Sequence, residues 1–103
     1  MKVTISDFKK NGEQDTSIEI EPYDTYNLDL TLALIILPCL KEYKEIAGER
    51  IDLAYSGLDK DLDTMIKAFE LIIEDNCSYD EETNKVISKG LKLFALKFKS
   101  LWW

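Results

Sequence analysis

The sequence predicts an α+β fold in which an N-terminal β-hairpin precedes three α-helices. Three observations predict it: alternating apolar and polar residues flank an Asn-Gly pair, a long apolar run follows, and two later segments carry apolar residues with a helical period. The 103 residues fit a single domain, residues 1–103. A composition of 46% hydrophobic and 32% charged residues is typical of a globular protein.

Residues 1–22 are expected to form the hairpin. Side chains alternate along residues 2–8 and again along residues 17–21, where Ile18 and Ile20 share one face. Asn11-Gly12, between the two segments, is a strong turn signal. Because an isolated hairpin is only marginally stable in water, this one must lie on the helices or pair with another chain.

The first helix is expected over residues 27–47. Asn27 is a suitable N-cap, and Asp29 falls in the first turn, where negative charge suits the helix dipole. Gly48 is a suitable stop. Pro38 lies inside the helix and removes one backbone hydrogen bond, so we expect a kink in the turn that precedes it.

This helix carries more apolar surface than a chain of this size can cover. Nine apolar residues stand between positions 30 and 40 and surround the helix, and a helix that is hydrophobic all round must be buried all round. The sequence therefore predicts a homo-oligomer with this helix near the interface; the alternative is full burial within one subunit. The run is too short for a membrane span, which needs about 20 residues.

Two amphipathic helices are expected to follow, over residues 59–75 and residues 80–102. Each has a single apolar stripe, as a helix with one buried face should. Gly90 lies in the stripe of the last helix, where glycine costs about 1 kcal/mol relative to alanine. A close helix crossing at Gly90 would offset that cost.

The composition excludes most catalytic and metal-binding chemistry. The chain has no histidine, which removes the commonest general base and the usual zinc ligand. Cys39 and Cys77 are far apart in sequence, and no glycine-rich phosphate loop is present. The acidic run after position 58 echoes a calcium loop, but Thr64 stands where that loop needs glycine. We therefore interpret the chain as a non-enzymatic protein with no cofactor and no metal.

The charge is unevenly distributed along the chain, whose formal net charge is −7. Residues 1–83 contain all 20 acidic residues, whereas residues 84–103 contain five lysines and no acid. An acidic protein lacks the positive surface that binds DNA or RNA. The basic segment either holds a phosphate group or an acidic partner, or complements the acidic part of its own fold or of a neighbouring subunit.

A polar-aromatic cluster before the first helix is the candidate ligand site. Tyr23 and Tyr26 offer aromatic faces for stacking, and Asp24 and Asp29 can accept hydrogen bonds from a base or a ribose. Thr25 lies between them. The alternative is a structural corner, in which the tyrosines pack the hairpin onto the helix and the aspartates cap it. The candidate site also includes residues that could add positive charge or a further aromatic face: Lys41, Lys89, Lys92 and Trp102.

Three segments follow one another in the order PYDTYNLDLTLALIILPCLKEYKE, LDTMIKAFELI and KGLKLFALKFKSLWW. Together they resemble a family of small uncharacterised proteins encoded by tailed bacteriophages, over about residues 18–102. The family pattern has a histidine where this chain has Leu30. Any function that needs that imidazole is therefore not expected here.

The resemblance implies a phage protein made in the cytoplasm of an infected bacterium. Small acidic phage proteins without catalytic residues include oligomers that trap nucleotide messengers of bacterial immunity. Our leading hypothesis is a homo-oligomer that sequesters such a nucleotide-derived signal, with no DNA, RNA or membrane partner. The alternatives are a protein that inhibits a host protein through its acidic, DNA-like face or its terminal tryptophans, and a small virion or morphogenesis protein. An enzyme ranks after these.

Overall fold

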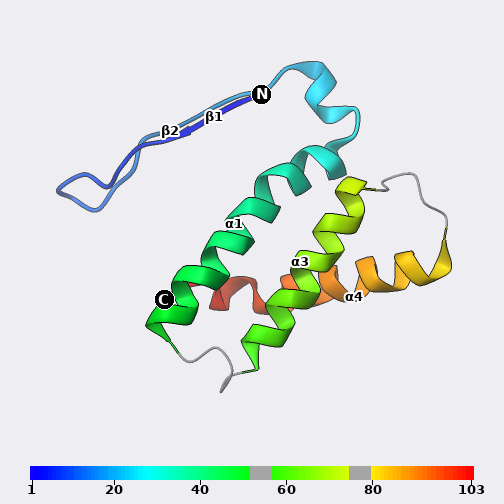
Figure 1. The fold of residues 1–103 in the computed structure, drawn as a ribbon. Coiled ribbons are helices and arrows are strands. Elements are labelled where there is room, and N and C mark those ends of the chain that lie inside the picture. Colours follow the sequence, from blue (N-terminus) through cyan, green and yellow to red (C-terminus); the bar gives the residue numbers. More distant parts are fainter. Residues whose placement is uncertain (52–56, 75–79) are drawn as a thin grey trace.

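The computed structural model of the chain describes residues 1–51, 57–74 and 80–103. A two-stranded antiparallel hairpin precedes three α-helices, the first of which is the longest (Figure 1). This order confirms the predicted fold class. The elements are β1 (Lys2–Ile5), β2 (Thr16–Glu19), the 3₁₀ turn η1 (Pro22–Thr25), α1 (Leu28–Arg50), α3 (Leu58–Glu74), α4 (Glu81–Lys97) and the 3₁₀ turn η2 (Phe98–Ser100).

The hairpin has the turn that the sequence predicts. Gly12 has a φ of +82°, in the left-handed region that favours glycine. The Oδ1 atom of Asn11 accepts a hydrogen bond of 3.0 Å from the backbone N–H of Glu13. The register of the strands places Val3 opposite Ile18, so these two side chains share one face of the hairpin.

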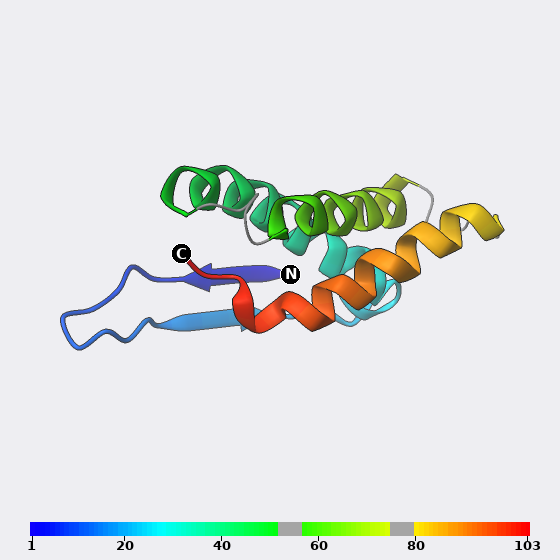
Figure 2. The same ribbon diagram turned by 90° about the horizontal axis from the view of Figure 1, so that it is seen from below.

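The hairpin extends away from the helices (Figures 1 and 2). All residues of both strands are exposed to solvent. The sequence allowed the hairpin either to pack on the helices of its own chain or to pair with another chain. The first arrangement is not observed. The uncovered apolar side chains of the hairpin, between 45% and 60% exposed, are Val3, Ile5, Ile18 and Ile20.

The long helix α1 differs in detail from its predicted form. Asn27 occupies the N-cap position, but its side chain makes no capping hydrogen bond. The helix passes the predicted stop at Gly48 and ends at Arg50, because Glu49 and Arg50 are strong helix formers and outweigh a single glycine, which costs about 1 kcal/mol. Pro38 lies inside the helix, which continues through it.

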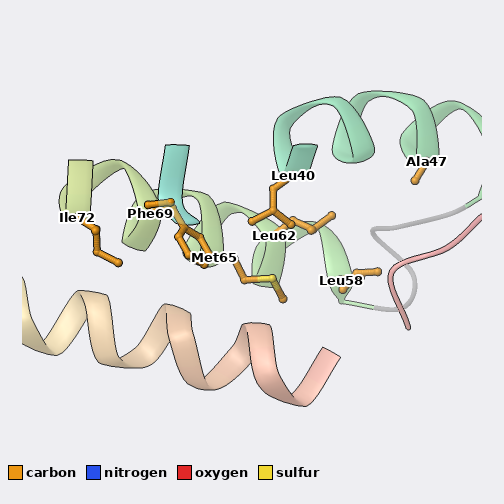
Figure 3. Packing of buried hydrophobic residues seen from close by; sticks show 8 residues of the cluster. Leu40, Ala47, Leu58, Leu62, Met65, Phe69 and Ile72 are labelled. Atoms are coloured by element: carbon orange, nitrogen blue, oxygen red, sulfur yellow. The ribbon is translucent and has the colours of Figure 1, made fainter. Parts of the chain in front are cut away.

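The hydrophobic core lies between α1 and α3, and α4 lies across one face of the layer that these two helices form (Figures 2 and 3). From α1, three buried residues recur at intervals of seven, or about two turns, and form a stripe that faces α3. Leu62 and Met65 of α3 are the largest fully buried side chains. The buried core cluster comprises Ala33, Leu40, Ala47, Leu58, Leu62, Met65, Phe69 and Ile72.

The helix α4 packs closely against α3 at a glycine, as the sequence predicts. Gly90 is buried, and a Cβ atom added there would overlap the Cβ of Ala68. Farther along the same contact, the ring of Phe94 stands edge-on to the ring of Phe69, with 5.3 Å between the centroids. The missing side chain at position 90 therefore permits the approach that the aromatic pair needs.

The last helix ends earlier than its apolar stripe predicts. The α-helix α4 ends at Lys97, five residues before the predicted end, and η2 follows it. The tail then runs beside α1, because the hydroxyl group of Tyr43 donates a hydrogen bond of 3.0 Å to the carbonyl oxygen of Trp102.

The molecule is flat and has a large surface for its mass. It measures 49 × 43 × 19 Å, and its radius of gyration is 15.5 Å, against about 13 Å for a compact domain of this length. The accessible surface is 7843 Å², whereas a compact monomer of this mass has about 6,000 Å². The chain thus exposes roughly 1,800 Å² more than a compact monomer would.

Candidate functional site

The turn η1 joins the hairpin to α1 and contains most of the predicted ligand cluster. The carboxylate of Asp24 is buried, and its Oδ2 atom lies 2.9 Å from the N-terminal ammonium of Met1. The same oxygen accepts a hydrogen bond of 2.8 Å from the backbone N–H of Glu21. The hydrogen bond from the ammonium, followed by that from Glu21, lowers the pKa of Asp24 below its usual value. Asp24 therefore acts as a charged clamp between β1 and the turn.

The hydroxyl groups of the threonines in this segment also donate hydrogen bonds to backbone carbonyl oxygens. The hydroxyl of Thr25 donates to the carbonyl oxygen of Pro22 at 2.8 Å, and the hydroxyl of Thr31 donates to the carbonyl oxygen of Asp24 at 2.9 Å. The polar groups of Asp24 and Thr25 thus hold the corner between hairpin and helix, whereas the tyrosines do not pack the hairpin onto the helix as the structural alternative expected. The polar atoms of Asp24 and Thr25 bond within the turn, so other residues form its outer surface.

The outer surface of the turn is aromatic. Tyr23 is 72% exposed and Tyr26 is 87% exposed. Tyr23 lies within η1, and Tyr26 follows the turn directly as its C-cap residue. Asp29 is exposed in the first turn of α1. These three side chains are open to a ligand, as is the exposed Thr25, whose hydroxyl is bonded to Pro22.

The predicted lysines lie on other elements. Lys89 and Lys92 line an open hollow of about 560 Å³ on the outer face of α4. Neither has an acidic partner within the described part of the chain, whereas Lys85, in the same hollow, lies 3.7 Å from Glu82. Lys41 projects from α1 toward α3, where its Nζ atom lies 3.5 Å from Glu70. The hollow on α4 is also lined by Glu81, which lies 3.9 Å from Lys85.

One chain does not bring the tyrosines and the lysines together. Lys41 follows Tyr26 by fifteen positions, which is roughly 20 Å along a helix. Figure 1 shows the turn before α1 and the helix α4 in separate parts of the molecule. A site that used both groups would need residues from more than one copy.

The C-terminal tail forms a second aromatic surface. Trp102 is 69% exposed; its backbone carbonyl accepts a hydrogen bond from Tyr43, and its backbone N–H donates one of 3.0 Å to the carbonyl oxygen of Ser100. The guanidinium group of Arg50 lies over the ring of Trp103, 5.0 Å from the centroid, which is a cation–π geometry. Burial raises the pKa of the Tyr43 hydroxyl above its ordinary value. The predicted site residue Trp102 thus belongs to a separate region from the tyrosine turn.

An apolar groove of about 310 Å³ lies between α1 and the C-terminal part of α4, and the predicted cluster did not include it. Two sequence signals point to it: the apolar run that surrounds α1, and the spacing of Phe94 and Phe98, one helical turn apart. Phe98 is 61% exposed at its edge. The groove is lined by Ile35, Ile36, Cys39, Leu40, Tyr43, Phe94, Phe98 and Leu101.

The rest of the apolar run on α1 is also open to solvent. Its exposed members form one side of the helix, opposite the stripe that packs on α3. Full burial of this helix within one subunit, the alternative weighed from the sequence, is therefore wrong. The exposed apolar residues on this side of α1, between 38% and 55% exposed, are Leu28, Leu32, Leu34 and Ile35.

Within residues 1–51, 57–74 and 80–103, no three of the side chains that commonly bind metals are grouped as a metal site would require. No described helix is long and apolar enough to cross a membrane. Comparison of the chain with protein-family models, with curated proteins and with solved structures finds no match.

Proposed function

We propose that the protein acts by binding, as a homo-oligomer that sequesters a nucleotide-derived signal of bacterial immunity on behalf of a phage. The observation that carries the proposal is the pair of exposed rings, Tyr23 and Tyr26, on a turn that the Asp24 ion pair holds in place. A base that stacks on such a ring gains about 1–3 kcal/mol, whatever its identity. A rigid platform keeps most of that gain, because little ordering occurs on binding.

The phosphate groups of such a ligand need a second, basic surface. The chain has a formal net charge of −7, so a phosphate is attracted only by local positive charge. Lys89 and Lys92 supply it, since neither forms an ion pair among the described residues. Because these lysines and the tyrosine turn lie apart in one chain, the proposed site combines the turn of one copy with α4 of another. Assembly is therefore part of the binding mechanism.

A thermal-shift panel of cyclic dinucleotides, cyclic trinucleotides and ADP-ribose tests the proposal directly. At 100 times its dissociation constant, a ligand that binds only the folded state adds about 2.7 kcal/mol to the free energy of unfolding. Tyr26→Ala should abolish the shift. The matched control is Phe8→Ala, which removes another exposed aromatic ring, 73% exposed, from the hairpin loop and should leave the shift unchanged.

The charge requirement is tested by a second pair of variants. Lys89→Ala combined with Lys92→Ala should weaken binding, and added salt should weaken binding to the wild type more than to this variant. Lys85→Ala, in the same hollow but close to Glu82, is the control. If no nucleotide shifts the melting temperature, the proposal fails. Co-purification of one host protein would then favour inhibition of that protein, and a chemically altered ligand would favour an enzyme.

A further inference from the structure

We propose that the hairpin of one copy packs its apolar face into the groove between α1 and α4 of a second copy, and that the second copy returns the same contact. The inference rests on the self-association in the proposed function, but it does not depend on the nucleotide ligand. It pairs two surfaces that a single chain leaves exposed, so that the apolar face of the hairpin in one copy covers the α1–α4 groove of the other.

The hairpin, formed by β1, β2 and the loop between them and called the arm below, has one apolar face. Val3 is paired with Ile18, and Ile5 is paired with Thr16, so all four side chains project on the same face. The opposite face carries Lys2 paired with Glu19 and Thr4 paired with Ser17. A sheet with one apolar face must bury that face against another element, and the described helices of its own chain leave it exposed.

The arm is held away from its own groove at its base. The ammonium group of Met1, where β1 begins, is 2.9 Å from Asp24 in the turn that leads into α1. Asp24 also accepts the backbone N–H of Glu21, where the arm ends. Both ends of the arm are therefore tied to one carboxylate, and this anchor sets the direction in which the arm leaves the helices (Figure 1).

The groove offers the surface that such an arm needs. Its walls are the apolar side of α1 and the aromatic residues at the end of α4. Phe98 is 61% exposed and Ile35 is 38% exposed, so both retain area that a partner can cover. Helices packed on one face of a sheet are the ordinary way to bury the kind of face that the hairpin presents.

The surface area of the chain fits a reciprocal exchange. A standard interface buries about 800 Å² on each partner, and the chain exposes roughly 1,800 Å² beyond what a compact monomer would. In a two-fold dimer each chain contributes one arm and one groove, so both apolar surfaces are covered at once. A closed pair then leaves no open edge for further copies at these surfaces.

The charges of the two surfaces are complementary. Residues 1–21 hold five acidic residues and three lysines, whereas residues 84–103 hold five lysines and no acid. Lys99, next to Phe98 of the groove wall, has no acidic partner in the described part of the chain. Opposite charge around an apolar contact favours the correct register and speeds encounter.

Cysteine cross-linking tests the contact, because Cys39 already stands in the groove wall. With Cys77→Ser as background, a cysteine is placed on the apolar face of the arm or, as a control, on its polar face. Under mild oxidation without nucleotide, at least one apolar-face variant should give a covalent dimer of about twice 11.9 kDa, at no less than tenfold the yield of either control. The apolar-face variants are Val3→Cys, Ile5→Cys and Ile18→Cys, and the controls are Thr4→Cys and Ser17→Cys.

Several outcomes would overturn the exchange. A cross-link within one chain would place the arm on its own groove, and equal yields on the two faces would remove the specific contact. Light scattering gives an independent measurement: Ile18→Glu should convert a dimer into a monomer, whereas Ser17→Glu should remain a dimer. A monomeric wild type that still gives a nucleotide shift refutes the exchange and the site shared between two copies, but not nucleotide binding itself. A cross-linked dimer without any shift refutes only the ligand.

Discussion

Gly90 of α4 lies directly against Ala68 of α3, so closely that a Cβ atom at position 90 would overlap the Cβ of Ala68. The added atom would also stand 2.8 Å from the carbonyl oxygen of Thr64. Neither obstacle can swing aside, because one is a Cβ and the other belongs to the backbone. The crossing of the two helices therefore depends on the absence of a side chain at position 90.

Gly90→Ala should destabilise the protein by roughly 1–2 kcal/mol. Overpacking costs about 1–3 kcal/mol, and the better helix propensity of alanine returns about 1 kcal/mol at most. Urea unfolding followed by circular dichroism measures the difference. Ser88→Ala, at an exposed position of the same helix, should change stability by no more than about 0.5 kcal/mol. A Gly90→Ala protein as stable as the wild type would show that the helices can separate without cost.

Leu62 and Leu96 allow the same change to be made inside and outside the core. Leu62 has no exposed surface, whereas Leu96 is 77% exposed. Leu62→Ala should cost about 2–5 kcal/mol, since it removes buried methyl groups and leaves a cavity. Leu96→Ala should stay within about 0.5 kcal/mol of the wild type. Similar losses at the two positions in thermal unfolding would mean that Leu96 is covered in solution.

Asp24 should make stability depend on pH in the acidic range. Its pKa is held below the usual 3.8, first by the N-terminal ammonium and then by the N–H of Glu21. A lowered folded-state pKa means that the stabilisation is fully present above the unfolded value and is lost as pH falls through the folded value. Asp24→Asn should therefore lower the melting temperature at neutral pH, and the two curves should converge on acidification.

Calorimetry between about pH 7 and pH 2 tests this prediction across the range in which carboxylates titrate. Asp29→Asn removes a neighbouring exposed carboxylate and controls for the change in net charge at neutral pH. Parallel curves for wild type and Asp24→Asn down to the lowest pH would show that the ion pair with Met1 does not stabilise the fold.

Tyr43→Phe should release the C-terminal tail without unfolding the helices. The substitution removes the 3.0 Å hydrogen bond to the carbonyl oxygen of Trp102, worth about 0.5–1.5 kcal/mol. Acrylamide should then quench the tryptophan fluorescence more strongly, while the helical signal stays constant. Tyr26→Phe, which alters an exposed ring in another region, should leave quenching unchanged. Equal quenching in both variants would mean that other contacts hold the tail.

Local features of this fold could be predicted from the sequence because they depend on near neighbours. The Asn11-Gly12 turn needs only a residue that tolerates positive φ. The stripe on α3 follows from the helical period, and Gly90 within the stripe of α4 points to a close crossing. The uncovered side of α1 could also be predicted, because apolar residues surround the helix and the rest of the chain is too small to cover them.

The tyrosines and aspartates before α1 could be located as a cluster, but their separate roles could not be predicted. Asp24 is occupied because Met1, 23 positions earlier, reaches it, whereas Tyr26 is left free on the surface of the same turn. From their positions in the sequence, Asp24 and Tyr26 are equally expected to be free to bind a ligand. Only the path of the hairpin decides which side chain finds a partner.

The sequence by itself determined the elements of this protein, its lack of histidine chemistry and the excess of apolar surface on α1. The tertiary structure alone decided the direction of the hairpin, the path of the tail along Tyr43, and the groove that α1 forms with Phe94 and Phe98. The physical reason is the separation along the sequence between the residues that interact. Turns and helical stripes arise from residues a few positions apart, but the groove joins helices that lie more than fifty positions apart and meet only once the chain has folded.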